Sequence, residues 1–234
     1  MAAVSYSAAT SFIAGILALM LAIGGGWIVY QEGATYLVEG RSGIDRTVAA
    51  LDHPVPAGIS MLSRRATLLD CRSTLVSLDS LTMRYYGPQV RTGAITHCEA
   101  LADVITERAP NDSLAWYVGA LAAAAAQDWP GMSKRLRASQ ISGPNEQWVA
   151  QPRASLAEDN FEHLDGAVLA GQEQDLKLLV SSGLGIRSIA RRYVTNPEFR
   201  ERIITIVETL PPLDQRRFAT NVRLQAQSQR LPSN

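Results

Sequence analysis

The sequence has no excess of charge of either sign. Its 234 residues include 22 basic and 22 acidic side chains, and only two of the basic residues are lysines, Lys134 and Lys177. A nucleic-acid-binding face needs surplus lysine and arginine to displace counterions from the phosphates. This balance therefore argues against nucleic acid as a partner.

Signals for β-strands are nearly absent as well. No sustained alternation of apolar and polar residues bounded by hairpin turns occurs in the chain. Apolar residues recur at helical spacing instead, for example at Ile95, Cys98, Leu101, Ala102 and Ile105. The sequence predicts an all-α fold.

The chain also lacks the residue groupings that catalysis and cofactor binding require. Its three histidines, His53, His97 and His163, are far apart in sequence, and none stands in a spaced metal pair. Gly183-Leu184-Gly185 has neither the preceding strand nor the lysine of a phosphate-binding loop. No nucleophile is paired with a base, so we expect a nonenzymatic protein with no catalytic residues, no metal and no cofactor.

An acidic cluster is the remaining candidate for such chemistry. Glu158, Asp159, Glu162 and Asp165 surround His163 and could coordinate a cation or act as acid and base. A run of charge in a loop is more simply a solvated surface, and we interpret it so.

Cysteine is scarce, with only Cys71 and Cys98 in the chain. An even number of cysteines on adjacent predicted helices can form a disulfide in an oxidising compartment. Two unrelated buried thiols are the alternative.

The sequence does contain a long uncharged apolar run from Phe12 to Tyr30. It predicts one transmembrane helix over residues 12–30, in contact with the lipid bilayer, after a short tail of residues 1–11. A cleaved signal peptide would have a basic start, a shorter core and small residues at its end. This run ends in Trp27 and Tyr30, which suit the lipid–water interface, so an uncleaved anchor is favoured over a signal peptide or a buried helix.

Small residues recur every four positions along this run. They would form a stripe at which another backbone could approach closely, either in a membrane partner or in a homo-oligomer. The predicted helix interface consists of Ala14, Ala18, Ala22 and Gly26. The alternative is that the abundance of alanine and glycine produces this spacing by itself.

Two rules disagree about the side of the membrane on which the rest of the chain lies. Arg41 and Arg46 follow the run and no basic residue precedes it, which favours a cytoplasmic domain. The cysteine pair favours an oxidising space. The bias towards arginine and alanine is typical of GC-rich bacterial genomes, and we predict a single-pass protein of the bacterial inner membrane with a periplasmic domain.

The most specific internal signal is a repeat. Pro110-Asn111-Asp112 recurs as Pro144-Asn145-Glu146, 34 residues later. Between them the sequence predicts one helix from Ser113 to Gln127 and another that has Pro130 in its first turn and ends near Gly143.

This stretch resembles the tetratricopeptide repeat family. The matching positions are Trp116, Ala120, Asp128-Trp129, Leu136 and Pro144, whereas Ala123 and Met132 depart from the pattern. Poorer units flank it on both sides. The resemblance implies a helical groove that binds a protein segment along the first helix of each pair. The residues that it places on this groove are Leu114, Tyr117, Leu121, Trp148, Gln151 and Ser155; for Tyr117 and Trp148 the alternative is a core position.

The domain organisation follows from these elements. We expect a membrane-proximal linker over residues 31–56, tetratricopeptide-like helical repeats over 57–160 and a helical C-terminal region over 161–234. The C-terminal region should contain helices at 175–182, 186–194, 198–210 and from 213 to about 227. The third has an apolar face that would cap the repeats, formed by Phe199, Ile203, Ile206, Val207 and Leu210.

The predicted function is a noncatalytic, membrane-anchored scaffold or adaptor for a protein partner in or at the membrane. The alternative is an accessory subunit of an envelope polysaccharide-export or secretion assembly, in which the anchor helix carries the specificity.

Overall fold

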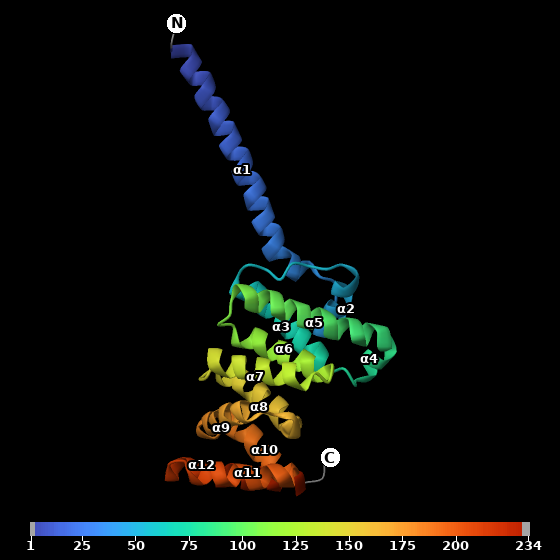
Figure 1. The fold of residues 1–234 in the computed structure, drawn as a ribbon, viewed down its shortest axis with the longest axis vertical. Helices are drawn as coiled ribbons and strands as arrows, with labels where there is room; N and C mark the ends of the chain where they lie inside the picture. The colour runs from blue at the N-terminus through green and yellow to red at the C-terminus, as the bar shows by residue number, and fades with distance from the viewer. Residues whose placement is uncertain (1–2, 231–234) are drawn as a thin grey trace. The chain divides into compact units, whose positions relative to one another are not determined.

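The computed structural model describes residues 3–230, with side chains described for residues 10–229, and this part of the chain consists of helices joined by turns and loops. No strand occurs in this range, so the all-α prediction is confirmed. The chain divides into two compact units, Met1–Val90 and Arg91–Asn234. Helices α1 (Ala3–Leu37), α2 (Gly43–Asp52), α3 (Met61–Val76) and α4 (Leu81–Tyr86) belong to the first unit (Figure 1).

Helix α1 is long and apolar enough to cross a membrane. Its segment Thr10–Leu37 has 28 residues, and none of its apolar stretch is buried against the protein. The predicted span of residues 12–30 lies within it. The helix already begins at Ala3, so residues 3–11 of the predicted tail are helical, while residues 1–2 lie outside the described part.

The predicted linker of residues 31–56 contains a helix that the sequence analysis did not anticipate. Ser42 and Asp45 form a reciprocal cap that starts α2: the Ser42 hydroxyl accepts from the Asp45 amide, and the Asp45 carboxylate accepts from the Ser42 amide. Helix α2 packs on α3, where Arg46 forms an ion pair of 2.5 Å with Asp70. The scattered glycines and acids of this segment concealed the helix.

The second unit is built from helices that pack in successive pairs. Helix α5 (Pro88–Arg108) begins at the unit boundary, and α6 (Ser113–Ala125) pairs with α7 (Trp129–Ser142). Helix α8 (Gln147–Asp159) pairs with α9 (Gly166–Ser181) after the short 3₁₀ turn η1 (Phe161–His163). Because α8 also contacts α6 and α9 contacts α7, one pair stacks on the other, as in helical repeats (Figure 1).

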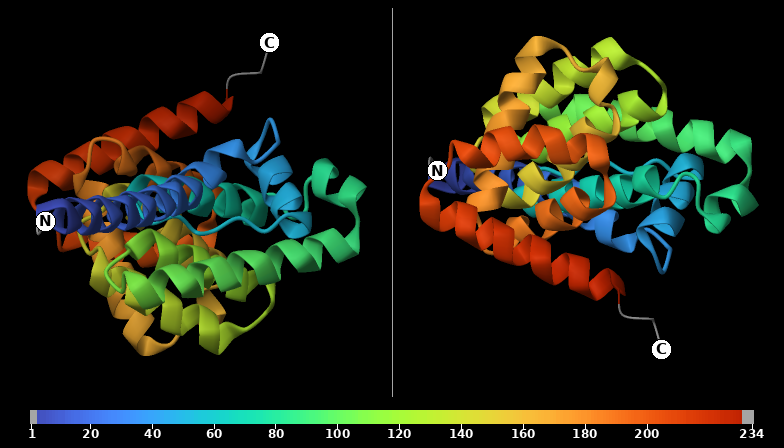
Figure 2. Two further views of the ribbon diagram at one scale, coloured as in Figure 1. Left: turned by 90° about the horizontal axis from the view of Figure 1, so that it is seen from above. Right: turned by 90° about the horizontal axis from the view of Figure 1, so that it is seen from below.

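Three further helices follow these pairs: α10 (Gly185–Thr195), α11 (Pro197–Glu208) and α12 (Pro212–Arg230). Helix α12, red in Figure 2, lies against α10 and α11. The predicted apolar face of α11 is in the core, since Phe199, Ile203 and Val207 are buried and Ile206 and Leu210 are partly buried.

Two local predictions differ from the structure. Helix α6 begins at Ser113 as predicted, where the Asp112 carboxylate accepts from the Ala115 amide at 3.1 Å, but it ends at Ala125 and not at Gln127. The helix expected over residues 175–182 already begins at Gly166, where Asp165 caps it. Gly171 in this helix packs closely on Gln140, because an added Cβ atom would lie 2.1 Å from the Gln140 side-chain oxygen. Gly171 therefore allows the close packing of α9 on α7.

Candidate binding pocket

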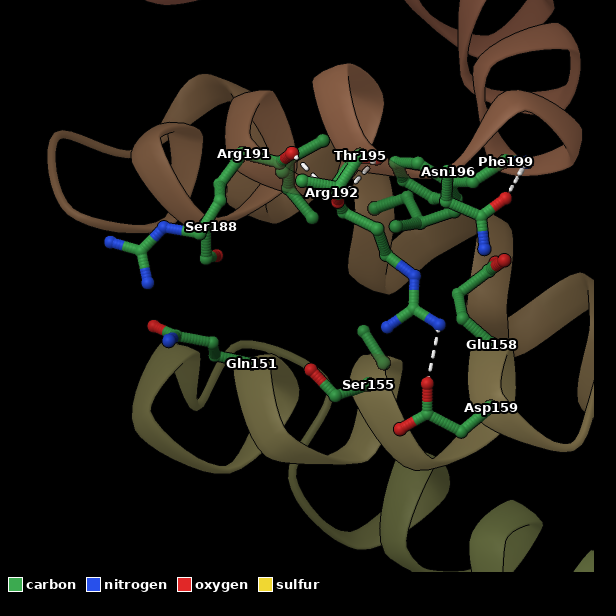
Figure 3. Close-up of a pocket in the computed structure, with 13 residues that line it drawn as sticks. Gln151, Ser155, Glu158, Asp159, Ser188, Arg191, Arg192, Thr195, Asn196 and Phe199 are labelled. Carbon is green, nitrogen blue, oxygen red and sulfur yellow. Dashed lines mark hydrogen bonds and ion pairs between the residues drawn. The ribbon is translucent and has the colours of Figure 1, made fainter. Parts of the chain in front are cut away.

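The second unit contains an open pocket of about 530 Å³ between α8, α10 and the first turn of α11 (Figure 3). Helix α8 contributes Gln151, Ser155 and Asp159, which are spaced four residues apart and so share one face of the helix. Helix α10 contributes polar residues at the same kind of spacing: Ser188, Arg191, Arg192 and Thr195. Apolar side chains complete the lining: Ala154, Leu176, Ile189 and Phe199.

Ion pairs hold the end of the pocket near the last turn of α8. Arg192 lies 2.5 Å from Asp159, joining α10 to α8. Glu158 is buried, pairs with Arg202 of α11 at 2.6 Å and accepts a hydrogen bond of 2.9 Å from the Gln172 side chain. These contacts anchor α10 and α11 on α8.

The opposite end of the pocket carries side chains with free hydrogen-bonding capacity. Arg191 is exposed and forms no ion pair with any described residue. In Figure 3 its side chain lies on the same side as Ser188, facing Gln151 across the opening. A guanidinium is a donor only, whereas the Gln151 amide and the Ser155 hydroxyl both donate and accept. The Ser188 hydroxyl donates to the Gly185 carbonyl at 2.7 Å, so it can only accept a hydrogen bond from a ligand. This group can bind the carbonyl and amide groups of an extended peptide.

The acidic cluster around His163 is largely engaged in protein contacts. Glu158 and Asp159 form the ion pairs above, and Asp165 accepts from the Val168 amide at 2.8 Å. The His163 ring stacks on Trp129, with ring centroids 4.0 Å apart and planes 7° apart. Within residues 10–229 no three His, Cys, Asp or Glu side chains are grouped so as to hold a metal ion.

The predicted groove residues divide into two sets. Gln151 and Ser155 line the pocket, and Trp148 is exposed one turn earlier on α8. Leu114 and Tyr117 are only 4% and 2% exposed, which corrects the expectation that they form a binding wall. Leu121, the remaining member of this set, is half-buried. Leu114 and Tyr117 are buried because α6 is covered around most of its circumference. The side of α6 that was expected to face a partner therefore packs in the core.

Sequence reasoning missed the α10 side of the pocket. The doublet Arg191-Arg192 is the available signal, but two adjacent arginines by themselves indicate only an exposed helix face. In the structure its two members differ, since Arg192 is paired with Asp159 and Arg191 is not paired.

The other predicted sites lie elsewhere. The small-residue stripe, Ala14, Ala18, Ala22 and Gly26, is exposed on α1, and an added Cβ atom at Gly26 would meet nothing within 4 Å. Cys71 in α3 and Cys98 in α5 are buried, and the described chain has no free cysteine. The compartment that this implies stays a prediction.

No protein-family model, no curated protein and no solved structure matches this chain. The tetratricopeptide resemblance therefore remains a prediction, and the pocket is interpreted from its own chemistry.

Proposed function

We propose that this protein is a noncatalytic, membrane-anchored adaptor that holds an extended segment of a protein partner in the pocket between α8 and α10. The observation that carries the proposal is the pocket itself, in which the Arg191 and Gln151 side chains face one another across the opening. An extended peptide presents carbonyl and amide groups along its backbone and side chains between them. Arg191 and Gln151 suit the backbone, and the buried side chains of Leu176, Ile189 and Phe199 form the floor of the pocket beneath them.

We further propose that α1 anchors this adaptor in a bacterial inner membrane, with the second unit in the periplasm. The support is the uncharged apolar run of α1 and the absence of a free cysteine in the described chain. An adaptor in this position would present its pocket to envelope proteins near the membrane surface.

The test is site-specific photo-crosslinking in cells, with the crosslinker in place of Gln151 and, as control, in place of Arg187. Arg187 is exposed on α10, the helix that carries Arg191, but it does not line the pocket. We expect a discrete crosslinked protein from position 151 only, and its loss in an Arg191→Ala background. Equal crosslinking from both positions would contradict the assignment of the pocket.

A second function is favoured by a separate observation, the full exposure of the small-residue stripe on α1. In this proposal the protein is an accessory subunit of an envelope export or secretion assembly, and α1 selects the partner in the membrane. Replacing residues 1–30 with an unrelated anchor separates the two functions. The adaptor would retain its partner, whereas the accessory subunit would lose it.

A further inference from the structure

The first unit contains a second pocket, of about 530 Å³, beside the C-terminal end of the apolar stretch of α1. The last turns of α1, the end of α2 and the loop after α2 enclose it. Its lining is mainly apolar and includes Val29, Ala34, Leu37, Pro54 and Val55. Glu39 and His53 are its only charged or titratable residues apart from Tyr30.

This pocket is continuous with the exposed apolar surface of α1. Val29, Gly33 and Leu37 all line it and recur every four residues, so they form one strip along the helix. Trp27 and Tyr30 are exposed at the start of this strip, with ring centroids 5.9 Å apart. Such aromatic residues are typical of the membrane–water boundary. The pocket therefore begins where lipid chains meet lipid headgroups, if α1 spans the membrane as proposed.

A second, independent observation indicates lipid at the same level. The Glu32 carboxylate accepts hydrogen bonds of 2.5 Å from the backbone amides of Ile59 and Ser60, which fixes the start of α3 beside α1. Ile59, Met61 and Leu62 are exposed there, Met61 and Leu62 by 70% and 72%. Large apolar side chains gathered around a membrane helix are better accommodated in the bilayer interface than in water.

We infer that this pocket binds an acyl chain of a membrane lipid, and that Ile59, Met61 and Leu62 rest in the bilayer interface beside it. The size of the pocket favours an acyl chain over a protein helix. A helix with its side chains is about 10–12 Å across, so about one turn would fill this volume. A flexible chain of methylene groups fits an open pocket that Pro54 and Val55 line on one side. The inference depends on the proposed membrane anchoring by α1.

The experiment uses the full chain in vesicles that contain phosphatidylcholine with a photoreactive group on one acyl chain. After illumination, peptides are mapped by mass spectrometry. We expect labelling of α1 and also of the segment 49–55, which lies outside the predicted span and lines the pocket with Ala49, His53, Pro54 and Val55.

Gly33→Phe should block the site, because an added Cβ atom at Gly33 meets nothing within 4 Å and a larger side chain can extend into the pocket. Labelling of residues 49–55 should then fall by about tenfold, since the ring takes the space of the acyl chain. The matched control is Gly25→Phe, also on α1 with nothing within 4 Å, which does not line the pocket. Ala49→Phe fills the pocket from α2 and should have the same effect as Gly33→Phe.

Equal labelling of residues 49–55 in all four proteins would overturn the inference, as would their crosslinking to a second protein chain in place of lipid. Alkaline carbonate extraction of the wild-type protein separates this failure from that of the proposed function. A chain that leaves the membrane contradicts the anchoring itself. A chain that stays in the membrane without labelling at 49–55 contradicts only the lipid site.

Discussion

At the scale of single residues, Arg153 connects three helices of the second unit. It is fully buried in α8 and makes a two-pronged contact with Asp175 of α9, at 2.5 and 2.7 Å. It also donates to the Ser139 carbonyl of α7 at 2.6 Å and to the Gly143 carbonyl at 3.3 Å. A buried charge with this many partners specifies how the helix pairs stack, because its partners must meet at one point.

Removing one partner of this pair should be costly. Asp175→Asn leaves the Arg153 charge uncompensated in the core, and we expect a loss of about 3–5 kcal/mol in unfolding free energy. Lys177→Ala is the control: it breaks the exposed pair between Lys177 and Glu173 on the same helix and should cost about 0.5 kcal/mol or less. Urea unfolding of the detergent-solubilised chain measures both. Similar losses of unfolding free energy in the two variants would show that the buried pair stabilises the fold no more than the exposed pair does.

His97 should make stability depend on pH. Burial lowers its pKa below the ordinary value of 6.5, so the folded chain disfavours the protonated ring. Below pH 6.5 the unfolded chain takes up more protons than the folded chain, and stability is therefore lost as pH falls. We expect the melting temperature of the wild type to fall more between pH 7 and pH 5 than that of His97→Gln. Parallel curves would exclude this contribution.

At the scale of elements, two helices of the second unit begin with glycine for different reasons. Gly166 starts α9, and an added Cβ atom there would meet nothing within 4 Å. Gly185 starts α10 and is buried; its added Cβ atom would lie 2.4 Å from the Ser182 hydroxyl and 2.8 Å from the Leu179 carbonyl oxygen. Only the second glycine is required by close packing.

The same substitution should consequently have opposite effects at these two positions. Gly185→Ala forces the backbone of α10 away from α9, and we expect a loss of about 1–3 kcal/mol. Gly166→Ala should be neutral or stabilise by up to about 1 kcal/mol, because alanine has the higher helix propensity. Thermal unfolding of the two variants in parallel tests this contrast. A destabilised Gly166→Ala variant would mean that the helix start is constrained by more than the contacts described.

At the scale of the whole molecule, the oxidation state of the two cysteines reports which compartment the protein faces. Cys71 and Cys98 are 1% and 0% exposed, so a reagent would not reach either of them in the folded chain, whether or not they are oxidised. Accessibility in intact cells is therefore uninformative, and the thiols must be trapped after acid quenching and denaturation.

We expect both thiols to resist alkylation in the denatured protein until a reductant is added, which would place them in an oxidising space. Alkylation of both without reductant would support the cytoplasmic orientation that Arg41 and Arg46 favour.

Local sequence was sufficient to predict the helical class, the apolar span of α1, the helix with Pro130 in its first turn, and the buried face of α11 around Phe199 and Ile203. Each of these depends on spacing within one helix, which periodicity and capping chemistry specify. Tertiary structure alone determined the pocket, because Gln151 on α8 and Arg191 on α10 meet only when the two helices pack. It likewise decided that Tyr117 is core: α6 has no polar face that would indicate which of its sides its neighbours cover.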